Sequence, residues 1–508
     1  MSRTILNRLN ASRPYICAEC TARLTPHRLR RYASLPMAAP KRGVLKLLEQ
    51  RGYVNQIAGD RNALEGLLDT RQVGFYAGID PTAPSLHLGH LLPLMVLFWL
   101  YQHGHHTVSL VGGATAKVGD PSGRLTSRAK TAEAVTESNL QAMHAQVAQL
   151  WQNAIQYGIR HGQGGEGVGR KELLNNAQWL DNLNILQFLK LMGNGMRVGT
   201  MLGRDTVRNK MEKGDGMSFS EFTYPLLQAW DWWQMYQDRG VQIQIGGSDQ
   251  YGNIIAGIDA VKYISQQNEQ TPANEHLRQE RSPMGLTVPL LATSSGEKFG
   301  KSAGNAVWLD RNLTSPFDLY GFLLRSTDDD VERYLNLFTF VTNDQIAAIM
   351  IEHRADPGKR IAQHLLASEV LELVHGPEEA IRTREEHETM RRPTVASLMN
   401  QNAGNTDTQQ AAAANQHIAL PKSLVLDAPF SRILYHAGLV ATKSEGARAI
   451  SKGGAYVATY TQGTESELNF VPIKDQRPAD IASLSIDGIL ILRLGKWKVR
   501  VIKVLDDK

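Results

Sequence analysis

The chain has 508 residues, of which 42% are hydrophobic and 21% charged, a composition typical of a globular protein with two or three hydrophobic cores. No apolar run reaches about 18 residues, so the sequence predicts no membrane-spanning helix. The formal charge of +5 is unevenly distributed, because residues 1–33 hold seven arginines and one acidic residue.

The arginine-rich residues 1–33 are typical of a mitochondrial presequence, with a processing site near Arg30–Ser34. We therefore expect a mature protein in the mitochondrial matrix, although a basic arm that contacts RNA is the alternative. Both cysteines, Cys17 and Cys20, lie in this segment. Two thiolates cannot complete a tetrahedral zinc site, so we expect no metal site and, after cleavage, no thiol nucleophile.

A strand, a loop and a helix are predicted in succession after residue 74. Residues 75–86 begin as an apolar run and are then broken by Gly, Asp and two Pro, which predicts a strand that ends in a loop. Residues 91–101 are almost wholly apolar, as in a buried helix, with Pro93 in its first turn. The sequence His87-Leu88-Gly89-His90 therefore falls at a helix N-terminus, which is suited to binding anions.

Two loops with paired glycines follow later apolar runs. Residues 108–111 precede the loop 112–124, and residues 241–245 precede the loop 246–253, after which 254–264 reads as a helix. This alternation predicts α/β layers with a parallel sheet. Glycines beyond a strand end let a backbone approach a ligand closely, and a carboxylate beside them suits ribose hydroxyls. A helix-capping turn is the alternative for 246–253.

A second cationic pattern, Lys298-Phe299-Gly300-Lys301-Ser302, lies about two hundred residues after the paired histidines. Alone, each pattern also fits a solvated turn. Together, two imidazoles and two lysines are the groups needed where charge builds on an α-phosphate and a departing pyrophosphate.

The C-terminal part of the chain is helical, then of low complexity, then basic. Charged helical patterns extend from 320 to 387, and residues 401–416 are rich in Asn, Gln, Thr and Ala without an apolar period, which predicts a flexible linker. Residues 421–508 hold 13 Lys and Arg against 9 Asp and Glu, which favours RNA binding.

Five motifs in one order resemble the bacterial-type class I tyrosyl-tRNA synthetases, and the presequence makes the chain similar to their mitochondrial form. The motifs are YAGIDPTAPSLHLGH (76–90), VGDPSG (118–123), FTYPLLQAWD (222–231), IGGSDQYGN (245–253) and KFGKS (298–302). The C-terminal segment 434–457 also looks like an S4-type RNA-binding motif. The resemblance implies an α/β fold with a Rossmann-like catalytic domain, a helical domain and a small α+β S4-like domain.

The predicted segments follow from this resemblance and from composition. They are a mitochondrial presequence (1–33), an N-terminal helical segment (34–75), a Rossmann-like catalytic domain with an insertion (76–315), a helical anticodon-side domain (316–396), a flexible linker (397–420) and an S4-like RNA-binding domain (421–508).

The resemblance implies activation of L-tyrosine by ATP, with Mg²⁺ accompanying the ATP, and transfer of tyrosine to mitochondrial tRNA(Tyr) by a homodimer. For tyrosine it implies Tyr76 and Asp231 at the phenol, Asp120, Tyr224 and Gln228 at the α-ammonium, and Gln250 beside the carboxylate. For ATP it implies Thr82, His87 and His90, the pyrophosphate-binding set Arg124, Arg128, Lys298 and Lys301, and the positioning residues Asp80, Gly89, Gly247, Asp249 and Ser302. For RNA it implies Lys443, Arg448, Lys452, Lys496, Lys498 and Arg500.

Three alternatives stay open. A tryptophanyl-tRNA synthetase would not be expected to combine Tyr76 with Asp231, and a nucleotidyltransferase that does not act on tRNA would have no use for the basic C-terminal region. Some fungal mitochondrial relatives assist group I intron splicing, and extra segments at 37–64, 266–281 and 459–485 are candidates for binding intron RNA.

Overall fold

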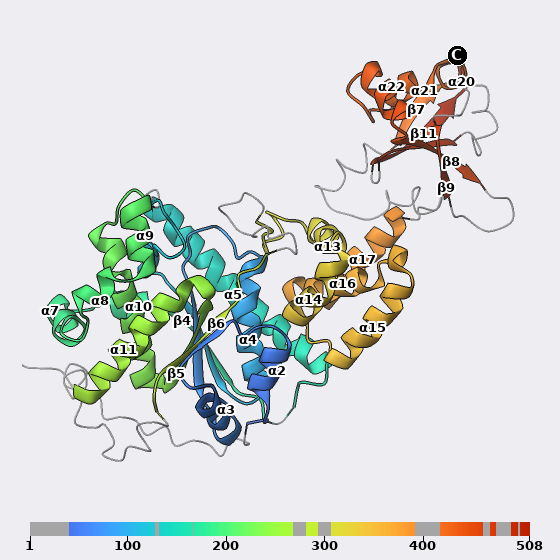
Figure 1. Cartoon of the computed structure of the whole chain (residues 1–508). Coiled ribbons are helices and arrows are strands. Elements are labelled where there is room, and N and C mark those ends of the chain that lie inside the picture. The colour runs from blue at the N-terminus through green and yellow to red at the C-terminus, as the bar shows by residue number, and fades with distance from the viewer. Residues whose placement is uncertain are drawn as a thin grey trace, which may run out of the picture. The chain divides into compact units, whose positions relative to one another are not determined.

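The computed structural model describes residues 40–127, 132–165, 167–267, 281–292, 306–391, 417–460, 468–473, 489–495 and 498–507. The described residues divide into two compact units, one up to 314 together with 326–362, the other 315–325 together with residues from 363 onward (Figure 1). Several predicted features lie outside the described residues: the presequence with both cysteines, the linker as far as 416, Arg128, Lys298, Lys301, Ser302 and Lys496.

The first unit is built on a six-stranded sheet of order β1-β6-β5-β2-β3-β4. Its strands are β1 (Gln56–Ala58), β2 (Gly74–Ile79), β3 (His106–Val111), β4 (Arg170–Asn175), β5 (Val241–Gly247) and β6 (Met284–Val288). The predicted parallel sheet is confirmed for β4, β3, β2, β5 and β6, whereas the edge strand β1 is antiparallel to β6. Because β3 and β5 flank β2 on opposite sides, the strand order reverses there, and such a reversal opens a crevice at the carboxyl ends of parallel strands.

Several α-helices of the first unit pack against this sheet, and others lie farther from it (Figure 1). They are α2 (Val44–Gln50), α3 (Arg61–Thr70), α4 (Leu91–Gln102), α5 (Glu133–Arg160), α6 (Ala177–Leu180), α7 (Ile185–Phe188), α8 (Val198–Leu202), α9 (Asp205–Lys213), α10 (Phe219–Arg239), α11 (Tyr251–Gln267), α14 (Asp328–Phe338) and α15 (Asn343–Ala355). Short helical turns are η1 (Leu88–His90), η2 (Thr115–Lys117), η3 (Leu189–Gly193), η4 (Ser248–Gln250) and η6 (Pro357–Lys359). The predicted buried helix is α4, which is apolar on every side, and α10 and α11 pack against β5 in the main core.

The second unit contains a helical part and a second sheet. The helices are α13 (Pro316–Leu324), α16 (Ile361–His375) and α17 (Pro377–Arg391), then α20 (Lys422–Asp427), α21 (Phe430–His436) and α22 (Lys443–Ser451). The sheet has the order β7-β11-β10-β8-β9, from β7 (His417–Pro421), β8 (Ala455–Tyr460), β9 (Leu468–Pro472), β10 (Ile489–Leu494) and β11 (Lys498–Leu505). Its core is shared with α20 and α21, an α+β arrangement. No helix among the described residues is both long and apolar enough to span a bilayer.

Two predicted segments differ from the structure. The segment 34–75, expected to be helical, also supplies β1 and so completes the six-stranded sheet of the first unit. The single helical domain expected at 316–396 is divided, because α14 and α15 belong to the first unit while α13 and α17 belong to the second. A helical sequence pattern does not reveal which core a helix joins.

A buried arginine fixes the N-terminal segment to the first unit. The Arg51 guanidinium is 2% exposed and donates to the carbonyls of Asn336 (3.0 Å), Thr339 (2.9 Å) and Val341. It also lies 4.5 Å from the ring centroid of Trp99 in α4. These contacts make the described part of the extra segment 37–64 an integral part of the fold.

Replacing Arg51 with Met should therefore lower the free energy of unfolding by about 3 kcal/mol, because three carbonyls, two of them in buried hydrogen bonds, lose their donor. Urea denaturation followed by tryptophan fluorescence measures this loss. Arg354→Met is the matched control, since Arg354 pairs with Glu332 at an exposed site, where a salt bridge contributes less than about 1 kcal/mol. Equal, small losses in both variants would contradict the structural role of Arg51.

Candidate active site

A cavity of about 540 Å³ lies at the carboxyl ends of β2 and β5, where the strand order reverses. Its lining includes every described residue that the sequence assigned to tyrosine or ATP: Tyr76, Asp80, Thr82, His87, Gly89, His90, Asp120, Arg124, Tyr224, Gln228, Asp231, Gly247, Asp249 and Gln250. The structure thus brings together residues from the β2 end, η1, the loop after β3, α10 and the loop after β5. A volume of this size is typical of small-molecule sites.

Asp231, in the middle of α10, is a buried carboxylate in this cavity with two side-chain donors. Its Oδ1 accepts from Trp179 Nε1 at 2.7 Å, and its Oδ2 accepts from Asn176 Nδ2 at 2.9 Å. Burial raises the pKa of Asp231 to about 7, although both hydrogen bonds act in the opposite direction. The carboxylate is thus oriented by its neighbours and poised to accept a further hydrogen bond.

Sequence reasoning missed both donors. Asn176 directly follows β4 and also donates to Thr115 Oγ1 at 2.9 Å, while its Oδ1 accepts from the Ala114 amide. Asn176 could have been identified as a candidate site residue because it lies just after a strand end, the same signal that identified the loops after β3 and β5. The charged start of β4 concealed that signal.

Tyr76, in β2, presents a second buried hydroxyl to the cavity. The residue is 1% exposed, and its ring lies against Trp232 with centroids 5.9 Å apart. Within the described part of the chain, its hydroxyl has no hydrogen-bond partner. Burial, followed by the charge of Asp231, raises the Tyr76 pKa well above its ordinary value. Since an unpaired buried hydroxyl costs about 1–3 kcal/mol, a ligand hydroxyl that bonds to it would be stabilising.

Asp120 and Asp80 form a group of hydrogen-bond acceptors in the cavity lining. Asp120 Oδ2 accepts from Gln250 Nε2 at 2.7 Å, and its Oδ1 accepts from the Ser122 amide at 2.9 Å. Asp80 Oδ2 accepts from the Tyr224 hydroxyl at 2.8 Å. Burial and then the charges of Asp80 and Asp120 raise the pKa of Tyr224 well above its ordinary value. Such a group of carboxylates favours a cationic ligand group, for example an ammonium.

The predicted histidine pair lies at a helix N-terminus. His87 precedes η1, which continues directly into α4, and the rings of His87 and His90 stack with centroids 3.8 Å apart. His90 Nδ1 accepts from the His87 amide at 3.1 Å. Together with Thr82 and Arg124 in the cavity lining, these donors suit an anion such as a phosphate.

Gly112 shows why a glycine follows β3. A Cβ at this position would lie 1.9 Å from Asp80 Oδ1 and 2.4 Å from Thr115 Oγ1. The sequence predicted that a ligand would approach this glycine closely. In the structure, the Asp80 and Thr115 side chains of the protein itself make that close approach. Among the described residues, no group of three or more His, Cys, Asp or Glu side chains could hold a metal ion.

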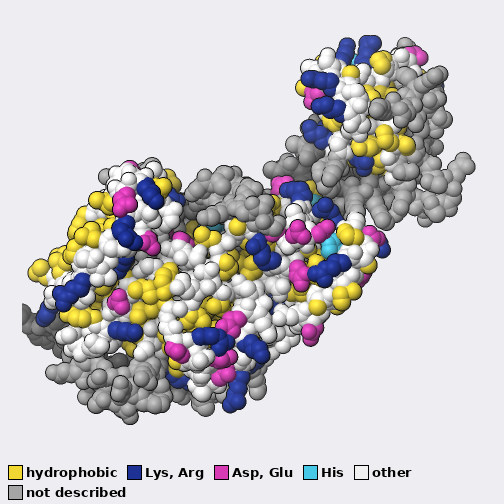
Figure 2. Space-filling view, in the orientation of Figure 1, with side chains coloured by type: hydrophobic (Ala, Val, Ile, Leu, Met, Phe, Trp, Pro, Cys, Tyr) yellow, Lys and Arg dark blue, Asp and Glu magenta, His cyan; other side chains and the backbone are white. Residues whose placement is uncertain are grey.

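The predicted RNA-binding residues lie on two elements of the second unit. Lys443 begins α22, Arg448 lies within it and Lys452 follows it, all exposed, while Lys498 and Arg500 lie on β11. Figure 2 shows Lys and Arg side chains gathered over the helices of this sheet domain. Arg500 is half-buried, unlike the exposed α22 residues, and burial lowers its pKa.

Comparison with known proteins decides the family. The description "tRNA synthetases class I (W and Y)" matches residues 68–391, and "Tyrosyl-tRNA synthetase C-terminal domain" matches residues 408–508. The chain belongs to the class I tyrosyl-tRNA synthetases. The predicted class I synthetase fold is thereby confirmed, and the C-terminal part is the C-terminal domain of this family.

Mitochondrial relatives in this family align with about nine-tenths of the chain. The mitochondrial tyrosine–tRNA ligase of Podospora anserina is 45% identical over 476 residues, which are 90% of this chain and 74% of that protein. The Drosophila melanogaster mitochondrial enzyme is 36% identical over 89% of this chain and 91% of its own length. A C-terminally truncated Aspergillus nidulans mitochondrial tyrosyl-tRNA synthetase aligns with a TM-score of 0.64 and 46% identity, over 69% of this chain and 94% of that one.

The raised pKa of Asp231 predicts that folding stability depends on pH. An unfolded Asp carboxyl releases its proton near 3.8, whereas the folded one keeps it until about 7, so the protein loses stability as pH rises through that window. The variant Asp231→Asn cannot ionise at this position. The free energy of unfolding of the variant, relative to that of the parent, should therefore be higher at pH 8 than at pH 5. Urea denaturation at both pH values measures this gain.

Asp238→Asn on the exposed face of α10 is the control and should follow the parent at both pH values. Any hydrogen bond that the Asp231→Asn variant loses is lost equally at both pH values, so only the change between them matters. An unchanged difference would contradict the burial of an ionising carboxyl.

Proposed function

We propose that this chain aminoacylates mitochondrial tRNA(Tyr) in two steps. The carboxylate oxygen of tyrosine attacks the α-phosphorus of ATP, and the bond to pyrophosphate breaks. A hydroxyl of the terminal tRNA ribose then attacks the acyl carbon of tyrosyl-adenylate, and AMP leaves. The observation that carries this proposal is one cavity that contains both a buried hydroxyl–carboxylate pair and a helix N-terminus with two histidines.

Tyrosine selection falls to Tyr76 and Asp231. A substrate phenol donates to the Asp231 carboxylate and accepts from the Tyr76 hydroxyl, which satisfies a buried donor that has no partner in the described part of the chain. Phenylalanine would leave the Tyr76 hydroxyl unpaired and would donate no hydrogen bond to the Asp231 carboxylate. In this proposal Asp120, Tyr224 and Gln228 hold the α-ammonium of tyrosine. Gln250, which donates to Asp120, lies beside the carboxylate of tyrosine.

ATP activation depends on positioning and on charge, without a covalent enzyme intermediate. Thr82, His87, His90 and Arg124 contact the phosphates, and Arg128, Lys298 and Lys301, which lie outside the described residues, complete the basic set. Asp80, Gly89, Gly247, Asp249 and Ser302 position the nucleotide. Mg²⁺ enters as part of the ATP complex and neutralises phosphate charge.

The exposed basic side chains of α22, with Lys498 and Arg500, bind tRNA in this proposal. Basic residues on one helix neutralise phosphates, so tRNA affinity should depend on salt. The names of the fungal and animal relatives support a mitochondrial location, and we place the mature protein in the matrix. No observation favours assistance to group I intron splicing, since the described part of segment 37–64 is built into the fold and most of 266–281 and 459–485 lies outside the described residues.

ATP–pyrophosphate exchange with protein starting at Ser34 tests the adenylation step, with tyrosine, phenylalanine and tryptophan offered separately. We expect exchange with tyrosine alone. A site built to hydrogen-bond a hydroxyl rejects the analogue without it by about 10⁴-fold or more, and tyrosyl-tRNA synthetases are the established example of that rule. Asp231→Ala should abolish exchange while the protein stays folded, and Asp238→Ala should leave it intact. Near-normal exchange in Asp231→Ala would overturn the phenol pocket.

We also propose a homodimer, and the apolar surface over α7 to α9 supports it. Ile185, Leu186 and Val198 are 62%, 72% and 61% exposed, and Figure 2 shows hydrophobic side chains gathered over these helices. Monomeric proteins rarely expose large apolar patches. A second copy of this chain is the occupant that a symmetric, self-complementary interface requires.

The combined variant Leu186→Asp, Val198→Asp should therefore sediment as a monomer where the parent sediments as a dimer. Analytical ultracentrifugation makes the measurement. Ile351→Asp on α15, equally exposed at 69% but outside this surface, is the control and should remain dimeric. A dimeric double variant would remove this surface from the interface.

A further inference from the structure

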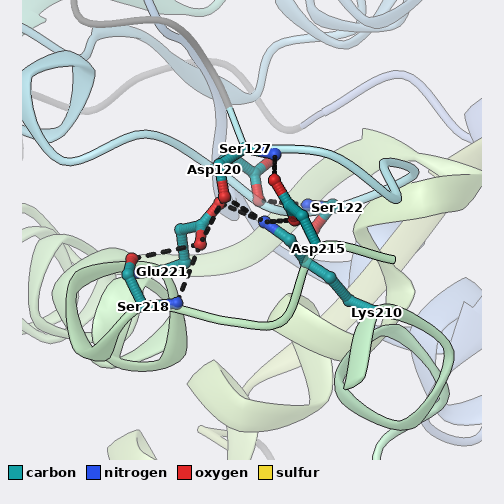
Figure 3. Close-up of polar contacts among 7 residues, drawn as sticks. All are labelled: Asp120, Ser122, Ser127, Lys210, Asp215, Ser218 and Glu221. Carbon is teal, nitrogen blue, oxygen red and sulfur yellow. Dashed lines mark hydrogen bonds and ion pairs between the residues drawn. The ribbon is translucent and has the colours of Figure 1, made fainter. Parts of the chain in front are cut away.

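A fully buried lysine lies outside the cavity lining and has no part in the reaction described above. Lys210, in α9, is 0% exposed, and its Nζ donates to Ser127 Oγ at 3.0 Å and to Glu221 Oε1. Its Nζ also lies 3.7 Å from Asp215 Oδ1. Figure 3 shows the lysine side chain reaching these partners from below the loop. A buried ammonium is stable only when it is paired in this way, so its partners constrain one another.

The first partner is the loop that follows Asp120. Ser127 donates through its amide to Asp215 Oδ2 at 2.8 Å and through its hydroxyl to Glu221 Oε2 at 3.2 Å. Two residues earlier, the Leu125 carbonyl accepts from the Asp215 amide at 3.2 Å. The distal end of the loop is therefore bonded to the turn between α9 and α10.

Close backbone packing at this turn is a separate observation. A Cβ on Gly214 would lie 2.1 Å from the Leu125 carbonyl oxygen, so the loop and the turn touch without space for a side chain. At its other end, the loop is fixed by Asn253 Nδ2, which donates to Ser122 Oγ at 3.1 Å, and by the bond from Gln250 to Asp120. Arg124 lies between the two attachments and lines the cavity.

The second partner is the N-terminus of α10. Ser218 and Glu221 form a capping box, in which the Glu221 amide donates to Ser218 Oγ at 3.2 Å and the Ser218 amide donates to Glu221 Oε2 at 3.0 Å. Burial alone would raise the pKa of Glu221, but the bonds from Lys210 and Ser218 outweigh it and hold the pKa below its ordinary value. One carboxylate thus both caps α10 and anchors Lys210.

We propose that Lys210 is a positioning residue for adenylation, which joins the Arg124 loop to α10 through Ser127, Asp215 and Glu221 and so holds Arg124 against the phosphates of ATP. This inference rests on the proposed tyrosine activation. Lys210 acts through the loop and touches no substrate.

Lys210→Met should raise the KM for pyrophosphate and lower kcat in ATP–pyrophosphate exchange, together on the order of 10- to 100-fold, as a displaced catalytic group does. The Kd for tyrosine, measured by tryptophan fluorescence, should change by less than about threefold, since the bonds of Asp231 are untouched. Lys213→Met, exposed on the same helix, is the control and should match the parent. Equal losses in tyrosine affinity and pyrophosphate KM would indicate a general structural role and overturn the inference.

A double-mutant cycle of Lys210→Met and Arg124→Ala tests whether Lys210 acts through Arg124. If Lys210 acts through Arg124, then Lys210→Met should change exchange by less than about twofold in the Arg124→Ala background. Multiplicative losses would overturn the inference. Ser127→Ala serves where Lys210→Met does not fold, because it removes only one hydroxyl, and we expect a roughly two- to tenfold loss of the same kind.

The outcomes separate the two proposals. Absence of tyrosine-dependent exchange in the parent would overturn the adenylation function and this inference with it. An active parent whose Lys210→Met and Ser127→Ala variants are also fully active would overturn the positioning role alone.

Discussion

The structure of the first unit depends on hydrogen bonds to a row of polar side chains along one face of α10. Glu221, Tyr224, Gln228 and Asp231 recur at spacings of three and four residues and so share one helix face. That face is turned inward, and each buried polar group must therefore find a partner on another element.

The partners come from several different elements that pack around α10. Lys210 of α9 donates to Glu221, and Asp80 after β2 accepts from Tyr224. Asn253 of α11 donates to Gln228, and Asn176 after β4 donates to Asp231. Strands, loops and two helices are thus positioned relative to one helix by hydrogen bonds whose loss would leave polar groups buried. The geometry of the site and the packing of the core are the same set of contacts.

Much of this arrangement follows from local sequence patterns. Apolar runs that end in glycines predict β2, β3 and β5 and the loops beyond them, and parallel strands bring such loops to one edge of a sheet. The family motifs supply the α10 residues. For this reason, all predicted substrate residues within the described chain line a single cavity.

Other features could not be predicted because their signals are tertiary. Lys210 lies in a short helix crowded with charged residues, where a lysine is expected to be solvated, and only packing against Ser127 and Glu221 buries it. Strand β1 has three residues, too few for a periodic pattern, and its pairing with β6 depends on residues more than two hundred positions away. The basic residues Lys298 and Lys301 stay predictions, because they lie outside the described residues.

The unpaired Tyr76 hydroxyl has a consequence for the life of the protein as well as for its chemistry. Without tyrosine, the core contains a buried donor with no acceptor in the described chain, next to a buried carboxyl whose ionised form is costly. A substrate that satisfies both groups binds only the folded chain, and its binding free energy adds to folding stability by mass action. The local supply of free amino acid would then set how long each molecule of this synthetase resists unfolding and proteolysis, so that the enzyme is most durable where its substrate is abundant.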